Sequence, residues 1–171
     1  MLSSEQKVQY SAQICQHLIL YLQNKGVQQL LVYKALPDEV NTDFLFKTTD
    51  IEVFAPKILA DTKMNWLRVT QQTVWEEAGF GVFEPASGDI WQLNAVRTML
   101  LCPLLGFDAH GNRLGMGKGY FDRWLAKHGE NIDVVGLAFS CQELSKVPIE
   151  PHDVPLNTII TEHGVISCPT P

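Results

Sequence analysis

Residues 113–123 read RLGMGKGYFDR, and this stretch joins a glycine-rich turn to the start of a predicted helix. Gly115, Gly117 and Gly119 stand at alternate positions, where the absence of side chains lets backbone N–H groups approach and surround phosphate oxygens. The helix that follows adds partial positive charge at its N-terminus. We therefore expect a phosphate-binding turn that runs directly into a helix.

Charged side chains flank these glycines in a pattern that suits a triphosphate. Lys118 can reach a terminal phosphate and Arg113 another. Asp122 follows on the first turn of the helix, and it is a sensible Mg²⁺ ligand because Mg²⁺ usually takes one or two carboxylates together with phosphate oxygens and water. A purely structural glycine turn is the alternative, and the charged neighbours make it the less favoured one.

Two familiar nucleotide motifs do not fit the stretch. A Walker A loop, GxxxxGK[ST], fails because the spacing from Gly111 to Gly117 is one residue too long and Gly119 replaces the hydroxyl residue. A Rossmann fingerprint needs its third glycine three positions after the second, whereas the sequence here is GxGxG. The turn therefore predicts a nucleotide site outside both classes.

Apolar runs typical of buried strands alternate with helical patterns on both sides of the turn. Strands are predicted at residues 30–33, 51–55 (stopped by Pro56), 64–70, 98–101, 104–107, 134–139 and 157–161. Helices are predicted from a Ser3/Gln6 capping box to a stop at residues 24–26, from Asn41 or Thr42 through Phe46, at residues 73–78 and at residues 120–128. The alternation predicts a single α/β domain over residues 1–171, with a mostly parallel sheet and helices on both faces.

Composition limits the possible functions. The formal net charge of -6, with both signs scattered, argues against a general nucleic-acid binder, which needs clustered Lys and Arg to displace counterions. The four cysteines lack the spacing of a zinc site, and we interpret them as reduced thiols. The sequence contains neither a signal-like segment nor an apolar run long enough to span a bilayer. We therefore expect a cytoplasmic protein without a nucleic-acid or membrane partner.

The turn belongs to a longer run of specific sequence. It includes PLLGFD at residues 103–108 and GNRLGMGKGYFDR at residues 111–123, with DEVNT at 38–42, FGVFEP at 80–85 and PHD at 151–153. Together these segments resemble the 5-formyltetrahydrofolate cyclo-ligase family, also called methenyltetrahydrofolate synthetase. The matches cover the chain from about Tyr33 to Ile166, and they imply a compact NagB/RpiA/CoA-transferase-like α/β fold.

The resemblance implies an enzyme of one-carbon metabolism. Such an enzyme uses ATP and Mg²⁺ to convert 5-formyltetrahydrofolate to 5,10-methenyltetrahydrofolate and releases ADP and phosphate. Transfer of the γ-phosphoryl group to the formyl oxygen creates an electrophilic iminium phosphate, which N10 of the substrate attacks. Because both partners of the ring closure belong to one molecule, positioning and charge stabilisation suffice, and we expect no covalent residue.

The resemblance also implies roles for individual residues. Glu39 resembles the acidic residue that binds the folate, and a carboxylate suits the N–H donors of a pterin. Asp122 and Asp153 resemble the Mg²⁺ ligands. Without the family match, Glu39 would be a solvated loop residue and Asp153 a turn residue. The segment that resembles the ATP site comprises Arg113, Leu114, Gly115, Met116, Gly117, Lys118, Gly119, Tyr120 and Phe121; Met116 to Tyr120 also face the formyl end of the substrate, and Lys118, Arg113 and Tyr120 are the expected catalytic residues.

The sequence departs from the family pattern at several positions. The family usually begins with a basic helix that helps to hold the nucleotide, whereas the only early cation here is Lys7. Met116 stands where an aromatic or basic residue is common, Phe121 where Tyr is frequent, and Asn41 where an acidic residue is common. Two alternatives therefore remain: a non-catalytic folate-binding module that has lost part of its ATP site, and an enzyme that uses another small formyl or carboxylate acceptor.

Overall fold

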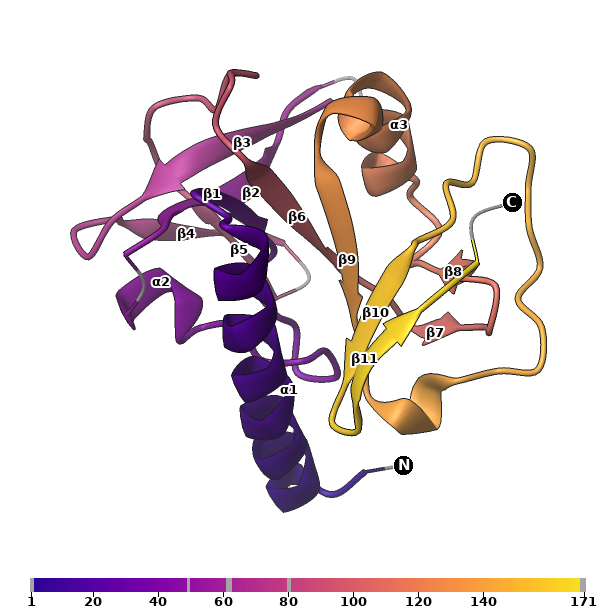
Figure 1. The fold of residues 1–171 in the computed structure, drawn as a ribbon. Helices are drawn as coiled ribbons and strands as arrows, with labels where there is room; N and C mark the ends of the chain where they lie inside the picture. The colour runs from indigo at the N-terminus through magenta and orange to yellow at the C-terminus, as the bar shows by residue number, and fades with distance from the viewer. Residues whose placement is uncertain (1, 49, 61–62, 80, 170–171) are drawn as a thin grey trace.

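A computed structural model describes residues 2–48, 50–60, 63–79 and 81–169 of the chain. Within these ranges it contains a seven-stranded sheet with the strand order β11-β10-β9-β6-β1-β2-β3 (Figure 1). Its five inner strands, from β10 to β2, pair in parallel, and the two edge strands pair antiparallel. The predicted mostly parallel α/β sheet is confirmed. The strands are β1 Gln29–Val32, β2 Glu52–Ile58, β3 Met64–Val69, β6 Thr98–Pro103, β9 Asp133–Leu137, β10 Thr158–Thr161 and β11 Gly164–Ser167.

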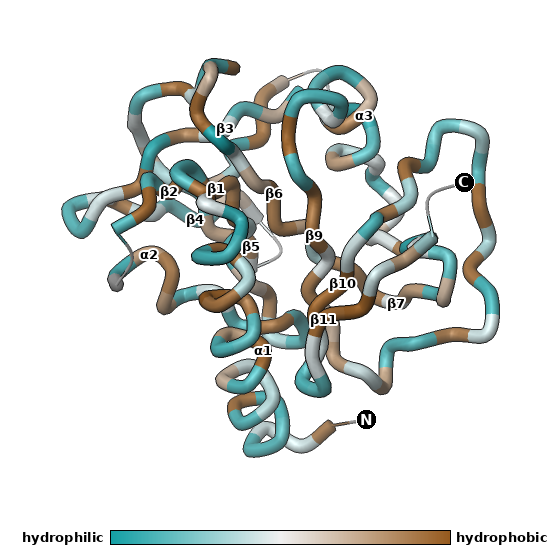
Figure 2. Tube along the Cα trace, viewed as in Figure 1, coloured by the Kyte–Doolittle hydropathy of each residue, from teal (hydrophilic) through white to brown (hydrophobic). Residues whose placement is uncertain are grey.

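The two faces of the sheet pack against different helices. Alternate side chains of β1 point to opposite sides, so Leu30 belongs to the core beside α1 (Ser4–Lys25) and Leu31 to the core beside α3 (Tyr120–His128). Hydrophobic colour follows the inner strands in Figure 2, as expected for strands buried on both sides. The prediction of helices on both faces is therefore confirmed.

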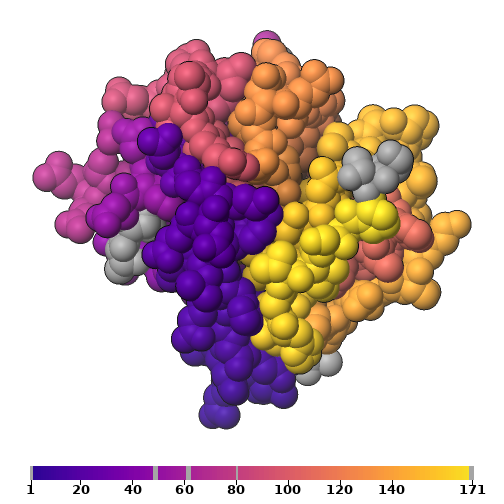
Figure 3. Space-filling view, in the orientation of Figure 1, coloured from indigo at the N-terminus to yellow at the C-terminus, as the bar shows by residue number. Residues whose placement is uncertain are grey.

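The first helix forms for reasons that the sequence displays. Ser3 and Gln6 make the predicted capping box, and Gly26 ends the helix in the left-handed conformation. Ile14 and Leu18 lie on its buried face. In Figure 3 the indigo surface of α1 lies directly beside the yellow surface of the C-terminal strands, in agreement with the contacts of α1 with β10 and β11. No helix in the described ranges is long and apolar enough to cross a membrane.

Short elements complete the chain between the strands of the sheet. Two antiparallel pairs stand outside the main sheet, and single helical turns connect some of its strands. The short elements are α2 Leu45–Thr48, β4 Trp75–Gly79 paired with β5 Val82–Pro85, β7 Gly106–Phe107 paired with β8 Arg113–Leu114, η2 Gly129–Asn131 and η3 Ser140–Gln142.

The helix predicted at residues 73–78 is wrong. Residues from Trp75 to Gly79 form strand β4, which pairs antiparallel with β5. The Trp75 ring contacts Phe46 at 5.2 Å between ring centroids, and the ammonium of Lys34 lies 5.0 Å from the Trp75 centroid. These contacts come from distant parts of the chain, so the tertiary packing overrides the weak helical pattern.

The strand predicted to stop at Pro56 continues to Ile58. Ile58 directs its N–H away from β3, toward the carboxylate of Glu84, and Pro56 lies two residues earlier on the same side. The neighbouring β1 has ended there, since it pairs with β2 only as far as Phe54. The missing N–H of Pro56 therefore breaks no ladder bond.

Two smaller differences involve local contacts. The helix predicted after Asn41 or Thr42 is present only as the single turn α2, because the Thr42 hydroxyl donates to the Tyr33 carbonyl at 2.7 Å instead of capping a helix. Strand β11 was not predicted. It is a four-residue edge strand with its Val165 side chain exposed, so it lacks the apolar run that marks a buried strand.

Candidate active site

Charged groups gather at the carboxyl ends of the parallel strands, where open α/β sheets usually bind ligands. Cys102 is buried near the end of β6, and burial raises the pKa of its thiol to about 11. Arg113 opposes this rise, whereas Asp122 and Glu39 add to it. Three charged residues from separate segments of the chain thus act on a thiol near the end of β6.

The loop that leads to the glycine-rich turn is organised by a buried carboxylate. Asp108 accepts hydrogen bonds from the backbone N–H groups of His110, Asn112 and Val147 at 3.0 to 3.1 Å and from the Asn112 side chain at 3.0 Å. Asp108 is only 1% exposed. It therefore joins the segment after β7 to residue 147 and sets the position at which Arg113 begins β8.

The predicted phosphate-binding turn, residues 115–119, is an exposed connection between β8 and α3. Gly117 and Gly119 have positive φ values of 78° and 64°, which residues with side chains rarely adopt. Gly119 is also the N-cap of α3, and as a glycine it offers no side chain to cap the first N–H groups of this helix. The Lys118 carbonyl accepts a 2.7 Å bond from Arg123. The turn thus presents backbone and helix N–H groups at the surface, as a phosphate site requires.

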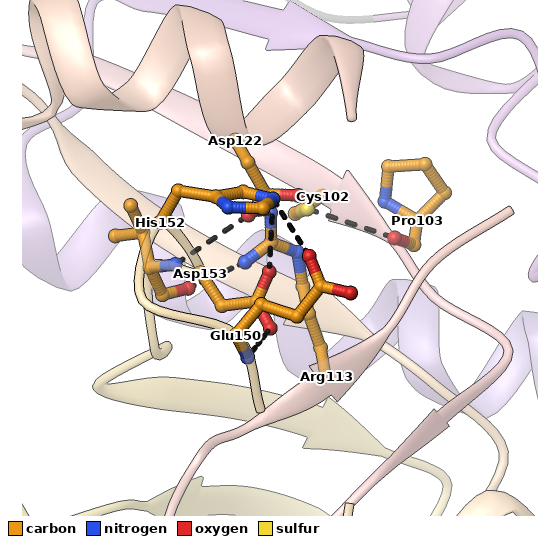
Figure 4. A network of polar contacts seen from close by, with 8 residues as sticks. Cys102, Pro103, Arg113, Asp122, Glu150, His152 and Asp153 are labelled. Atoms are coloured by element: carbon orange, nitrogen blue, oxygen red, sulfur yellow. Dashed lines mark hydrogen bonds and ion pairs between the residues drawn. The ribbon is translucent and has the colours of Figure 1, made fainter. Parts of the chain in front are cut away.

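Arg113 connects the turn with a segment that is distant in the sequence. Its guanidinium donates to Asp122 Oδ1 at 2.5 Å and also to the Val154 carbonyl. The backbone N–H of Val154 donates a hydrogen bond to the same Asp122 oxygen at 3.4 Å. Figure 4 shows this network with Asp153 and Glu150 beside it. The structure therefore brings the predicted metal ligands Asp122 and Asp153 into one neighbourhood.

Asp153 lies in a small polar loop with its own contacts. Its Oδ2 accepts the Glu150 backbone N–H at 2.7 Å, and His152 Nε2 lies 3.3 Å from Glu150 Oε2 and 4.0 Å from Asp153 Oδ1. Within the described parts of the chain, no group of three or more His, Cys, Asp or Glu side chains could hold a metal ion. Two carboxylates alone suit Mg²⁺ that takes its other ligands from phosphate and water.

Glu39 lies in the loop after β1 and is half-buried. Burial raises the pKa of its carboxyl group, and a 2.8 Å bond from the Leu36 N–H opposes the rise. The loop itself is held by the buried Tyr33, whose hydroxyl donates to the Val40 carbonyl at 2.9 Å. Glu39 is therefore an acceptor placed at the carboxyl end of the sheet, as its predicted contact with a pterin requires.

The remaining predicted residues line the turn and the start of α3. Met116 is 64% exposed, Leu114 is 42% exposed and Lys118 is also exposed. Tyr120 and Phe121 are half-buried and pack toward the core beside α3, with the Arg123 guanidinium 5.2 Å from the Tyr120 ring centroid. Phe80, which belongs to the FGVFEP match, lies outside the described residues.

Sequence reasoning did not place Cys102 or Glu150 in the site. Cys102 had a usable signal, because it stands near the end of an apolar strand and just before Pro103. Glu150 stands only three residues before Asp153, so its place beside that predicted ligand was also a usable signal. Glu84, by contrast, is buried and accepts the Ile58 N–H at 2.9 Å, so its role is to join β5 to β2.

A mostly parallel α/β sheet with a glycine-rich turn and grouped carboxylates at its carboxyl edge defines a class of ligand-binding α/β enzymes. The model of the 5-formyltetrahydrofolate cyclo-ligase family matches residues 1–162. The chain belongs to this family. The resemblance inferred from the sequence motifs is thereby confirmed.

Relatives from several bacteria agree with this assignment. A 5-formyltetrahydrofolate cyclo-ligase of Haemophilus influenzae is 30% identical over 167 residues, which cover 93% of this chain and 89% of that protein. A 5,10-methenyltetrahydrofolate synthetase structure from Mycoplasma pneumoniae superposes with a TM-score of 0.74 and 28% identity over 94% of this chain and 90% of that one. The Aquifex aeolicus synthetase gives a TM-score of 0.80 and 27% identity over 99% and 87%.

Proposed function

We propose that this chain converts 5-formyltetrahydrofolate to 5,10-methenyltetrahydrofolate with MgATP and releases ADP and phosphate. Membership of the family supports the reaction. The observation that carries the ATP part is the exposed turn at residues 115–119, which leads into an uncapped helix whose Asp122 lies in one polar network with the segment of Asp153. These are the parts that a triphosphate and its metal ion need.

The reaction needs two successive displacements. The formyl oxygen attacks the γ-phosphorus of ATP, the bond to the β-phosphate oxygen breaks, and ADP leaves. The resulting iminium phosphate has an electrophilic carbon, which N10 attacks with loss of its proton; the departure of phosphate then completes the methenyl ring. Neither step needs a protein nucleophile, so the contribution of the chain is positioning and charge stabilisation.

Individual residues of the chain would supply these contributions. Lys118 and the N–H groups of residues 114–121 would hold the phosphates, and Tyr120 would lie beside the transferred group. Asp122 and Asp153 would hold Mg²⁺, which when bound neutralises charge on the phosphates. Glu39 would accept N–H groups of the pterin, in a half-buried place where a carboxylate that accepts two donors binds firmly. Arg113 belongs to the same ATP-binding segment as Lys118 and Tyr120.

The direct test is an assay of turnover. Purified chain is incubated with 5-formyltetrahydrofolate and MgATP, and the absorbance of methenyltetrahydrofolate is followed together with ADP release. We expect equimolar products, and no product when ATP is omitted or when EDTA removes the metal. A folded preparation, shown by a cooperative thermal transition, that forms no product would overturn the proposal.

Two further measurements separate the alternatives. Micromolar MgATP affinity in titration calorimetry would argue against a non-catalytic folate-binding module, which would bind folate alone. Release of ADP with a different formyl or carboxylate acceptor, but not with 5-formyltetrahydrofolate, would favour the second enzyme. We also propose that residues 1–171 form one domain and act in the cytoplasm; the four free cysteines suit a reducing compartment.

A further inference from the structure

Arg113 is a charged residue that the fold encloses. Its side chain is only 5% exposed, and that of Asp122, its partner, is 20% exposed. Lys118, five residues further along the same segment, is exposed. The two cations of the predicted ATP segment are therefore placed differently, and only the lysine lies at the surface where a phosphate would arrive.

The donors of Arg113 already have protein partners. One terminal nitrogen donates to Asp122 Oδ1 and the other to the Val154 carbonyl. Despite the opposing effect of burial, Cys102 and Asp122 raise the pKa of the guanidinium above its ordinary value. A planar fork that reaches two acceptors at once is a property of arginine that lysine does not have.

The partners of Arg113 connect the two proposed metal ligands. Asp122 belongs to α3, and Val154 follows Asp153 directly in a segment that is distant along the chain. Val154 also donates its N–H to Asp122 Oδ1, so Arg113 and Val154 bind the same carboxylate oxygen. The distance between Asp122 and Asp153 thus depends on the arginine fork.

A direct phosphate contact by Arg113 would have to break this arrangement. Its fork would leave Asp122 and the Val154 carbonyl, and a largely buried carboxylate would lose its charged partner. Lys118, by contrast, is exposed in the turn.

We propose that Arg113 is a positioning residue, which acts on ATP through Asp122 and the segment of Asp153 and leaves phosphate contact to Lys118 and the turn. The inference rests on the proposed function. It predicts that Arg113 matters for nucleotide that carries Mg²⁺ and matters little for nucleotide without the metal. A direct phosphate ligand would matter for both.

The test measures nucleotide affinity by calorimetry, with ATP in Mg²⁺ and with ATP in EDTA. The variants are Arg113→Lys, Arg113→Gln and Lys118→Met, with Lys127→Met as the control for loss of one positive charge elsewhere on α3. We expect both Arg113 variants to lose about tenfold or more in MgATP affinity and to stay within about twofold for metal-free ATP. Lys118→Met should weaken both, and Lys127→Met neither.

A double variant checks that Arg113 acts through Asp122. Asp122→Asn should weaken MgATP binding by itself, and Arg113→Lys with Asp122→Asn should be little worse than the single changes, because both remove the same placed carboxylate. Folate affinity and a cooperative thermal transition show that each variant is folded. If Arg113→Gln fails to fold, Arg113→Lys and the double variant still decide the question.

Four results would contradict the inference or its basis. Arg113→Lys that keeps full MgATP affinity, or Arg113→Gln that weakens metal-free ATP as much as MgATP, would make Arg113 a direct phosphate ligand and leave the proposed function intact. Additive losses in the double variant would do the same. Absence of MgATP binding in the unaltered chain would overturn the proposed function and this inference together.

Discussion

The helices α1 and α3 lie on opposite faces of one sheet, and their N-termini are built differently. In α1, Ser3 Oγ accepts the Gln6 N–H at 3.2 Å and Gln6 Oε1 accepts the Ser3 N–H at 2.9 Å. In α3 the N-cap is Gly119, which offers no side-chain acceptor. A capped end satisfies its own N–H groups, whereas an uncapped end leaves them for an anion. The comparison suggests that α1 contributes to stability and that the start of α3 is kept for a ligand.

The largest expected effect comes from the charge beside the start of α3. Lys118→Ala should lower kcat/KM about 100-fold or more, because it removes charge stabilisation of phosphoryl transfer, while stability changes by less than about 0.5 kcal/mol. The control is Lys25→Ala in the last turn of α1, where Nζ lies 5.5 Å from the Tyr21 ring centroid. Turnover and thermal unfolding are measured for both. Equal losses of stability and activity at Lys118 would indicate a structural turn.

A smaller effect is expected from two glycines that share a backbone conformation. Gly119 has φ 64° and Gly26 has φ 62°, and an added Cβ would meet only the flexible end of Arg123 at Gly119 and nothing within 4 Å at Gly26. Alanine should therefore cost about 1 kcal/mol of stability at either site, from the left-handed backbone alone.

Function should separate these two alanine variants. Gly119→Ala should weaken MgATP binding about tenfold, because small displacements of positioning groups are costly, and Gly26→Ala should leave it unchanged. Calorimetry and urea unfolding provide the two measurements. If both variants bind MgATP normally, the start of α3 has no special part in nucleotide binding.

The cap of α1 gives the opposite pattern. Ser3→Ala removes the acceptor for the Gln6 N–H and should cost about 1 kcal/mol, which lowers Tm by roughly 2 to 4 °C in a chain of this size. We expect kcat/KM to stay unchanged at temperatures well below Tm. A fall in activity without a fall in Tm would show that α1 also influences the site.

The smallest expected effect concerns Glu39, which lies in the loop after β1 and is the residue proposed to bind the pterin. Burial raises the pKa of this carboxyl group, so folding favours its protonated form. The stability that comes from Glu39 is thus present at low pH and is lost as pH rises through the raised pKa.

Glu39→Gln should test this with a pH-dependent difference. At pH 7 the variant should be at least as stable as the unaltered chain, and its advantage should shrink as pH falls toward the ordinary glutamate range. Its folate affinity should fall at the same time. Urea unfolding at pH 7 and pH 4 measures the difference, and a variant that is less stable by the same amount at both values would contradict the expected sign.

The predictable parts of the fold were those with strong local patterns. We could identify β1, β6, β9 and β10 because strands buried on both faces need continuous apolar runs. The ends of α1 could be identified because helix ends favour capping residues. Trp75 and Pro56 were misread because β4 and the end of β2 depend on partners elsewhere in the chain. The local propensity of a segment carries no information about partners that are distant in the sequence.

The candidate site divides in the same way. The glycine turn, Lys118 and Asp122 could be selected from spacing and residue type, and Glu39 and Asp153 came from the family resemblance. The surroundings of Arg113 could not be anticipated, because the Val154 carbonyl lies 41 residues further along the chain. Sequence alone suggested a phosphate contact for this arginine, while burial among protein acceptors points to a positioning role.

The amino-acid sequence by itself therefore determined the α/β class, the family and the glycine-rich turn, because each depends on residue types and their spacing along the chain. Only the tertiary structure decided which polar groups meet, such as the Arg113 guanidinium with the Asp122 carboxylate and the Val154 carbonyl. The physical reason is that hydrogen bonds and electrostatic interactions act between groups that are close in space. Their nearness depends on the folded arrangement of strands and loops.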